Sequence, residues 1–174
     1  MTRTFISIDL PENVKKEVQK IQNQLPEFFG KKIELGNLHL TLKFLGEIDE
    51  EKIKLVKEKL KIINTSSFDL ELDEIGVFSP HHIRIVWLHI KGADELQKVV
   101  DSVLGEIFKP EERFMGHLTI ARVKNIKSKK EFLESLRKIE IPRIKFKAHC
   151  FRLMKSELRP DGPIYSVLEE YKLK

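Results

Sequence analysis

The sequence predicts an α+β protein with two pseudo-symmetric lobes, each an antiparallel sheet with helices on its outer side, facing each other across a central cleft. Three observations support this prediction. Strand-like and helix-like hydrophobic patterns alternate along the chain. The segment 39–42, His-Leu-Thr-Leu, returns as His-Leu-Thr-Ile at 117–120, a separation too long for a solenoid repeat and suited to a duplicated lobe. The 174 residues, 41% hydrophobic and 34% charged, fit a single domain over residues 1–174 made of two intertwined lobes.

The first half of the chain predicts the order strand, helix, strand, helix. Residues 4–10 alternate like a strand, and Pro11 suits the first turn of the helix that follows. The apolar residues of that helix recur at helical spacing until Pro26. A strand over about residues 38–45 then carries His39, and an amphipathic helix follows over about residues 49–63.

The second half predicts a similar order of elements. Residues 68–73 and 83–90 indicate a hairpin interrupted by turn residues. A helix over about 93–108 leads into the strand of His117, and a helix over 128–139 begins with a Ser cap and a Glu three places on. Residues 144–154 predict one long strand, 160–163 a turn and 164–173 a closing strand.

The two His-x-Thr strands are the centre of the functional prediction. Successive side chains of a strand point to opposite faces, so each His shares a face with the Thr two positions later. We therefore expect one apolar core face and one face that carries chemistry. In strict alternation Lys43 joins His39 on the second face, whereas Arg122 lies opposite His117 unless a bulge or strand end turns it round.

Two imidazoles facing one cleft suit a reaction that removes one proton and delivers another. Hydrolysis of a phosphodiester requires both transfers. The hydroxyl groups of Thr41 and Thr119 are expected to bind non-bridging phosphate oxygens and to stabilise the charge that develops there. Such a site needs no metal and no other cofactor.

The two motifs resemble those of the 2H phosphoesterase superfamily, whose signature is a pair of His-x-Thr/Ser motifs. Within it the chain is most similar to the RNA 2′,3′-cyclic phosphodiesterases, also called 2′-5′ RNA ligases, with further matches at residues 3–8, 76–78, 84–87, 156–158 and 162–165. The resemblance implies metal-independent opening of a terminal 2′,3′-cyclic phosphate on RNA to a 2′-phosphate, with reversible 2′-5′ joining.

The resemblance also implies the roles of the two histidines. His39 would be the proton donor to the leaving 3′-oxygen, and His117 the acceptor that activates water. The residues by themselves leave these two roles interchangeable. Gly116 stands where family members often have Pro, which predicts a looser backbone beside His117.

Several other residues are candidates for contact with the substrate. Lys43 and Arg122 could hold phosphate, and Tyr165 could stack on a base, as could Phe78 and Trp87, although aromatic residues in such patterns are typical of a core. The lysine-rich stretch 124–130 fits either an RNA-backbone contact or a solvated helix start.

Two other functions stay open at this stage. A metal-dependent hydrolase would use His39 and His117 with His81 or His149, although no His-Glu-x-x-His spacing is present. A non-catalytic module that binds RNA ends would keep the cleft and the charge but show no turnover.

Charge and composition bear on partner and location. The net charge of +5 favours a polyanionic partner, here RNA with 2′,3′-cyclic phosphate ends, tRNA fragments among the candidates. No apolar run approaches the roughly 20 residues that span a bilayer, and no signal-peptide cleavage pattern opens the chain. We therefore expect a cytoplasmic protein without a membrane partner. Two lobes complete the cleft, so a monomer suffices, and the single cysteine, Cys150, is expected in the core.

Overall fold

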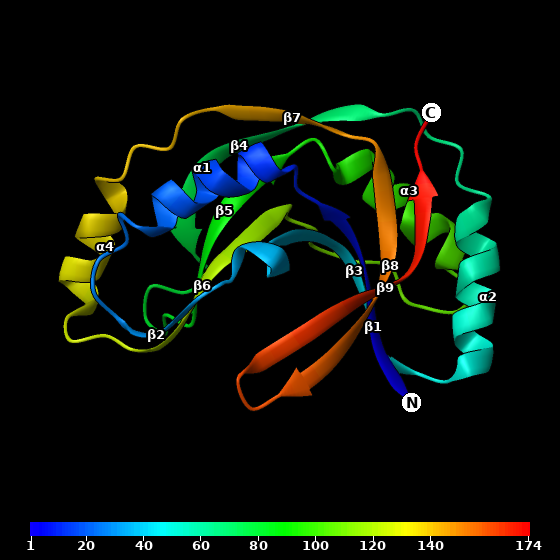
Figure 1. The fold of residues 1–174 in the computed structure, drawn as a ribbon, viewed down its shortest axis with the longest axis horizontal. Helices are drawn as coiled ribbons and strands as arrows, with labels where there is room; N and C mark the ends of the chain where they lie inside the picture. The colour runs from blue at the N-terminus through cyan, green and yellow to red at the C-terminus, as the bar shows by residue number, and fades with distance from the viewer.

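The computed structural model describes all 174 residues and shows a curved antiparallel sheet with four helices packed on the face away from the cleft (Figure 1). The strands are β1 (Thr2–Asp9), β2 (Phe29–Lys32), β3 (His39–Ile48), β4 (Phe68–Val77), β5 (Ile85–Lys91), β6 (His117–Asn125), β7 (Ile144–Ala148), β8 (Cys150–Arg159) and β9 (Gly162–Lys172). The helices are α1 (Glu12–Gln22), α2 (Glu50–Lys61), α3 (Asp94–Leu104) and α4 (Lys129–Arg137), with a short 3₁₀ turn, Leu35–Asn37. The strand order is β7-β4-β5-β6-β3-β1-β8-β9, and β2 pairs with residues Ala121–Asn125 of β6.

This sheet consists of two lobes joined at its middle. We call β7, β4, β5, β6 and β2 the His117 lobe, and β3, β1, β8 and β9 the His39 lobe. Only Leu40 and Leu118 pair between β3 and β6, at the junction of the lobes. The predicted pair of pseudo-symmetric lobes is therefore confirmed, with their sheets continuous through this one contact.

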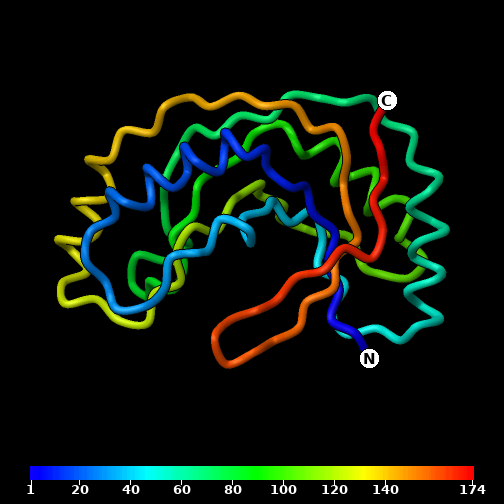
Figure 2. Tube along the Cα trace, viewed as in Figure 1, coloured from blue at the N-terminus to red at the C-terminus, as the bar shows by residue number.

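The chain passes repeatedly from one lobe to the other (Figure 2). Helix α1 follows β1 of the His39 lobe yet packs against β6, and α3 follows β5 of the His117 lobe yet packs against β3. Helix α4 packs against β4, and α2 against α3 and β9. Because each lobe takes a helix from the chain of the other, the lobes share one hydrophobic core of 34 buried residues.

Local sequence signals explain the helix starts. The carboxylate of Asp49 accepts a hydrogen bond of 2.8 Å from the backbone N–H of Lys52 at the start of α2. The hydroxyl of Ser128 accepts one of 3.3 Å from the N–H of Glu131, which confirms the predicted cap of α4. None of the four helices has the length and apolarity that crossing a membrane requires.

The strands differ from the predictions in two places. The long strand expected over residues 144–154 is two strands, because β7 pairs with β4 in the His117 lobe and β8 pairs with β1 in the His39 lobe. The chain changes lobe at His149, between them. The edge strand β2 was not predicted, since it is four residues long and exposed. At Gly30 (φ +152°) a side chain would collide with the carbonyl oxygen of Arg122.

Candidate active site

Strands β3 and β6 share one irregularity that decides which side chains reach the cleft. In β3 the consecutive residues Leu42 and Lys43 are both buried, and the next residue, Phe44, is exposed. The pairing with β1 skips Leu42. An extra residue of this kind is a β-bulge, which reverses the faces of the residues that follow it, as far as a second irregularity at Leu45 in β3.

The same irregularity recurs at the equivalent place in β6. Ile120 and Ala121 are both buried, Arg122 is exposed, and the pairing with β5 skips Ile120. The burial patterns of the first nine residues of the two strands are identical. The internal repeat thus extends beyond the His-x-Thr residues to the bulge.

The bulge in β3 places Lys43 on the core side. Its side chain is 2% exposed, and its Nζ lies 2.5 Å from Oδ1 of Asp101 and 2.7 Å from the carbonyl oxygen of Lys109. Burial by itself would raise the pKa of Asp101, but hydrogen bonds from Lys43, the Glu111 N–H and Gln97 outweigh it and lower that pKa. The prediction that Lys43 shares the face of His39 is therefore wrong.

The bulge in β6 has the opposite effect on Arg122. Strict alternation would place this residue behind the sheet, whereas its side chain lines the cleft. It forms no ion pair with a carboxylate. Its guanidinium is therefore free to bind a substrate anion.

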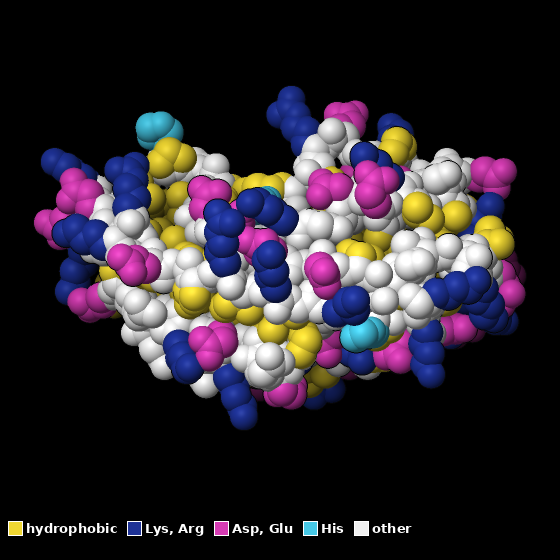
Figure 3. Space-filling model, turned by 90° about the horizontal axis from the view of Figure 1, so that it is seen from above, with side chains coloured by type: hydrophobic (Ala, Val, Ile, Leu, Met, Phe, Trp, Pro, Cys, Tyr) yellow, Lys and Arg dark blue, Asp and Glu magenta, His cyan; other side chains and the backbone are white.

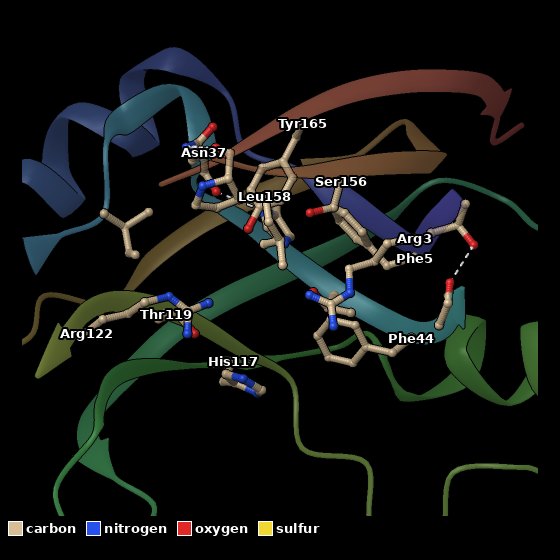
Figure 4. A pocket seen from close by; sticks show the side chains of 16 residues that line it. Arg3, Phe5, Asn37, Phe44, His117, Thr119, Arg122, Ser156, Leu158 and Tyr165 are labelled. Carbon is tan, nitrogen blue, oxygen red and sulfur yellow. Dashed lines mark hydrogen bonds between the residues drawn. The ribbon is translucent and has the colours of Figure 1, made fainter. Parts of the chain in front are cut away.

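The cleft contains a cavity of about 560 Å³ between the two lobes. Figure 4 shows His117, Thr119 and Arg122 on one side of it, and Phe5, Phe44, Tyr165 and Arg3 on the other. Its full lining is Arg3, Thr4, Phe5, Ile33, Asn37, His39, Thr41, Phe44, Gly46, His117, Thr119, Arg122, Ser156, Leu158, Pro163 and Tyr165. Both predicted histidines, both threonines, Arg122 and Tyr165 thus meet in one cavity.

The two imidazoles are held by equivalent hydrogen bonds. Nδ1 of His39 lies 2.8 Å from the carbonyl oxygen of Asn37, and Nδ1 of His117 lies 2.8 Å from that of Met115. A carbonyl oxygen only accepts, so each Nδ1 carries a proton and donates it. Each Nε2 is then the nitrogen that gains or loses a proton during a reaction.

His39 lies in an aromatic enclosure. Its ring centroid is 4.9 Å from that of Phe5 and 5.1 Å from that of Tyr165, which approaches edge-on. Burial lowers the pKa of His39, and the nearby charges of Arg122 and His117 lower it further. The hydrogen bond to the Asn37 carbonyl and the carboxylate of Asp9 act in the opposite direction.

The aromatic ring beside His117 is more exposed to solvent than those beside His39. The ring of Phe78, 55% exposed, stands edge-on to it with centroids 5.0 Å apart. Across the sheet its Cα partner is His89, whose Nδ1 lies 2.6 Å from Oδ1 of Asp73. The looser backbone predicted at Gly116 is not observed. The carbonyl oxygen of Gly116 accepts a hydrogen bond from the N–H of Ile90, and a side chain at Gly116 would collide with the carbonyl oxygen of Ile90.

Several lining residues were not predicted as site residues. Arg3 and Ser156 come from paired positions of β1 and β8, and Asn37 bonds to the carbonyl oxygen of Pro163 at 3.3 Å. Arg3 and Ser156 reach the cavity through long-range strand pairing, which only the matches at 3–8 and 156–158 hinted at, and Asn37 reaches it from the 3₁₀ turn. Phe5 likewise carried no sign of lying against His39.

The remaining histidines and Cys150 lie apart from the cavity. His81, His82 and His149 are exposed and do not line it. No group of three or more His, Cys, Asp or Glu side chains is arranged to hold a metal ion. Cys150 is partly exposed at the start of β8, not in the core as predicted, and burial raises the pKa of its thiol.

Comparison with known proteins identifies the family. The family description "LigT like Phosphoesterase" matches residues 8–87 and 90–165. The chain belongs to this family of phosphoesterases, part of the 2H superfamily. A relative from Methanocaldococcus jannaschii, named RNA 2′,3′-cyclic phosphodiesterase, is 39% identical over 175 residues that cover 97% of this chain and 99% of the relative. One of the same name from Thermotoga maritima is 38% identical over 180 residues, covering 97% and 94%.

Solved structures of LigT-like phosphoesterases share the fold. A crystal structure of a Thermus thermophilus protein has a TM-score of 0.80 and 26% identity, covering 98% of this chain and 97% of the other. The crystal structure of Escherichia coli LigT in complex with 3′-AMP also has a TM-score of 0.80 and 26% identity, covering 99% and 98%. The two-lobe arrangement is thus common to this chain and these proteins.

Proposed function

We propose that this protein opens the 2′,3′-cyclic phosphate at the end of an RNA chain to a 2′-phosphate by acid-base catalysis between His39 and His117, without a metal. The observation that carries the proposal is the presence of two identically held imidazoles in one cavity, each with Nε2 available for proton transfer. The names of the relatives from M. jannaschii and T. maritima support the substrate class.

In the proposed step His39 donates a proton from Nε2 to the leaving 3′-oxygen. His117 accepts a proton at Nε2 from the attacking water, so that one P–O bond forms as the P–O3′ bond breaks. The attacking and leaving oxygens lie in line across the phosphorus atom, which places them toward opposite lobes of the cleft. Both histidines then exchange their protons with solvent before the next turnover.

The phosphate itself is held by uncharged and charged donors. The hydroxyls of Thr41 and Thr119 each follow a histidine on the same face of its strand and line the same cavity. Together with Arg122 they would stabilise the negative charge that grows on the non-bridging oxygens. Tyr165 would contact the terminal nucleoside on the His39 side. A hydroxyl group at the 5′ end of a second RNA, in place of water, would give a 2′-5′ linkage by the same step.

The whole chain would act as one unit, because each lobe supplies one histidine. We propose a monomer in the cytoplasm, with RNA fragments such as those of tRNA as substrates. Nothing in the site requires a second subunit to complete it.

The test is to incubate the purified protein, in excess EDTA, with a short RNA ending in a 2′,3′-cyclic phosphate and to identify the product ends. The proposal predicts a 2′-phosphate from the wild type and none from His39→Ala or His117→Ala. No product from the wild type, with RNA binding intact, would favour the end-binding module. Activity that EDTA abolishes would favour a metal-dependent hydrolase.

A further inference from the structure

A substrate longer than one nucleotide must extend beyond the cavity. Arg3 lines the cavity in the His39 lobe and Arg122 lines it in the His117 lobe, and the substrate can extend past either of them (Figure 4). An RNA backbone carries one negative charge for each phosphate. The charges at the two ends therefore distinguish the two routes.

The Arg3 end opens into a second hollow of about 350 Å³ that contains carboxylates. Glu47 is the Cα partner of Arg3 on β3, and Glu157 also lines this hollow. Lys155 lies 2.6 Å from Glu157 and lowers its pKa, so this carboxylate keeps its charge. At this end the two carboxylates offset the charges of Arg3 and Lys155, which makes it a poorer route for a polyanion.

The Arg122 end carries three cations that form no ion pair with a carboxylate. Lys124 follows two places later in β6 and is exposed on the same side as Arg122. The guanidinium of Arg84 bonds to the carbonyl oxygen of Lys124 at 2.8 Å. Neither Arg84 nor Lys124 forms an ion pair with a carboxylate. We call Arg84, Arg122 and Lys124 the cationic edge.

Lys31 borders the cationic edge, and Phe78 lies beside His117 in the same lobe. Lys31 on β2 is the Cα partner of Arg122, although it also pairs with Glu34 at 2.9 Å. The exposed ring of Phe78 stands between His117 and Trp87, with centroids 5.0 and 5.9 Å away. Proteins bind single-stranded nucleic acid by combining cations that follow the backbone with exposed aromatic rings on which bases stack.

The opposite, convex side of the molecule offers no comparable surface. Viewed from above, basic and acidic side chains are mixed over this face (Figure 3). The positive net charge of the chain is thus not gathered there into a patch of one sign.

We infer that the RNA chain 5′ to the cyclic phosphate leaves the cleft over Arg122 and binds along the cationic edge. This inference rests on the proposed function and specifies where that function holds the body of its substrate. Arg84 and Lys124 contact backbone phosphates beyond the terminal nucleotide and take no part in the chemistry. They therefore matter for a long substrate and not for a mononucleotide.

The experiment compares two substrates, a nucleoside 2′,3′-cyclic phosphate and a short oligonucleotide with the same cyclic end, in the variant with Arg84→Gln and Lys124→Gln. The expected result is a loss of about tenfold in kcat/KM for the oligonucleotide, with the mononucleotide unaffected. The dependence of log kcat/KM on log salt should weaken by about 1.4 for the oligonucleotide, at roughly 0.7 for each phosphate contact on single strands. Unchanged turnover of the mononucleotide shows that the variant is folded.

Lys155→Gln is the matched control, since it removes one cation from the other end of the cavity. It should change neither substrate. An oligonucleotide defect in Lys155→Gln but not in the double variant, or equal behaviour of all three proteins, would overturn the inference while leaving the proposed function intact. A wild type that opens neither substrate would instead refute the proposed function and the inference with it.

Discussion

The rings of His39 and His117 are held in the same way but have different surroundings. Each donates from Nδ1 to the carbonyl two residues earlier, and each strand has its bulge at the same place. The Cα partner of His39 on the next strand is Asp9, a carboxylate, whereas that of His117 is His89, a base. The two lobes thus share the bulge and the hydrogen bond that holds the ring but differ in the residue next to each histidine. Two copies of one motif can therefore take opposite roles in proton transfer.

The enclosures of the two rings differ as well. His39 lies between Phe5 and Tyr165, and burial is the largest influence on its pKa. His117 borders Phe78, which is more than half exposed to solvent. Water has an easier approach to the His117 side, which agrees with the proposed role of His117 as the base that activates it.

The largest expected effect is the loss of either histidine. His39→Ala and His117→Ala should each lower kcat by about 10²- to 10⁴-fold, since each removes one proton-transfer group. The rates are measured with the cyclic-ended RNA, and melting temperatures check the fold. His81→Ala, in an exposed turn, is the control and should retain full activity. If only one of the two variants shows a lower kcat, the lobes do not share the reaction.

The next test concerns Lys43, the bulge residue of β3 whose equivalent in β6 is Ala121. Lys43→Met should lower the free energy of unfolding by roughly 3–5 kcal/mol, because it leaves the buried carboxylate of Asp101 without its ion partner. Denaturant unfolding measures this change. Its kcat/KM at a temperature where the variant is folded should equal that of the wild type. A fall in kcat/KM without a loss of stability would indicate that Lys43 contacts the substrate after all.

The paired threonines test whether both strands hold the phosphate. Thr41→Val and Thr119→Val keep the shape but remove the hydroxyl, and each should lower kcat by about 10- to 100-fold. Thr2→Val, on a threonine outside the cavity, is the control. If only one of the two variants lowers kcat, the phosphate is bound from one lobe alone.

The smallest expected effect concerns pH. With His39 as the acid, kcat/KM should fall as pH rises through its pKa, which burial holds below the usual value for histidine. Asp9 raises this pKa, so Asp9→Asn should move the alkaline limb of the profile to still lower pH. The equivalent change in the other lobe, Asp73→Asn, should leave that limb in place. Movement of the limb to higher pH in Asp9→Asn would contradict the assignment.

The sequence predicted the two lobes and the shared face of each His-Thr pair because these depend on the repeat and on local periodicity. His39 and Thr41 precede the bulge, so strict alternation places them correctly. Lys43 and Arg122 follow it, and one extra residue exchanges the faces of both. No residue type in Leu42-Lys43 or Ile120-Ala121 signals a bulge, so periodicity alone could not locate it.

Long-range pairing accounts for the other differences. The break at His149 reflects a change of pairing partner from β4 to β1, which a continuous strand pattern does not reveal. Phe5 lies against His39 because β1 pairs with β3, and Tyr165 because β9 pairs with β8. Such contacts depend on register between distant segments and not on the residues near each histidine.

The most direct test of the central claim uses a substrate whose leaving atom needs no proton. A 2′,3′-cyclic phosphate with sulfur in place of the 3′-oxygen departs as a thiolate, so the general acid becomes dispensable while the base does not. We predict that this substrate restores most of the activity of His39→Ala, relative to the wild type, and none of that of His117→Ala. Rescue of His117→Ala instead would reverse the two roles, and equal behaviour of both variants would contradict a division of acid and base between the lobes.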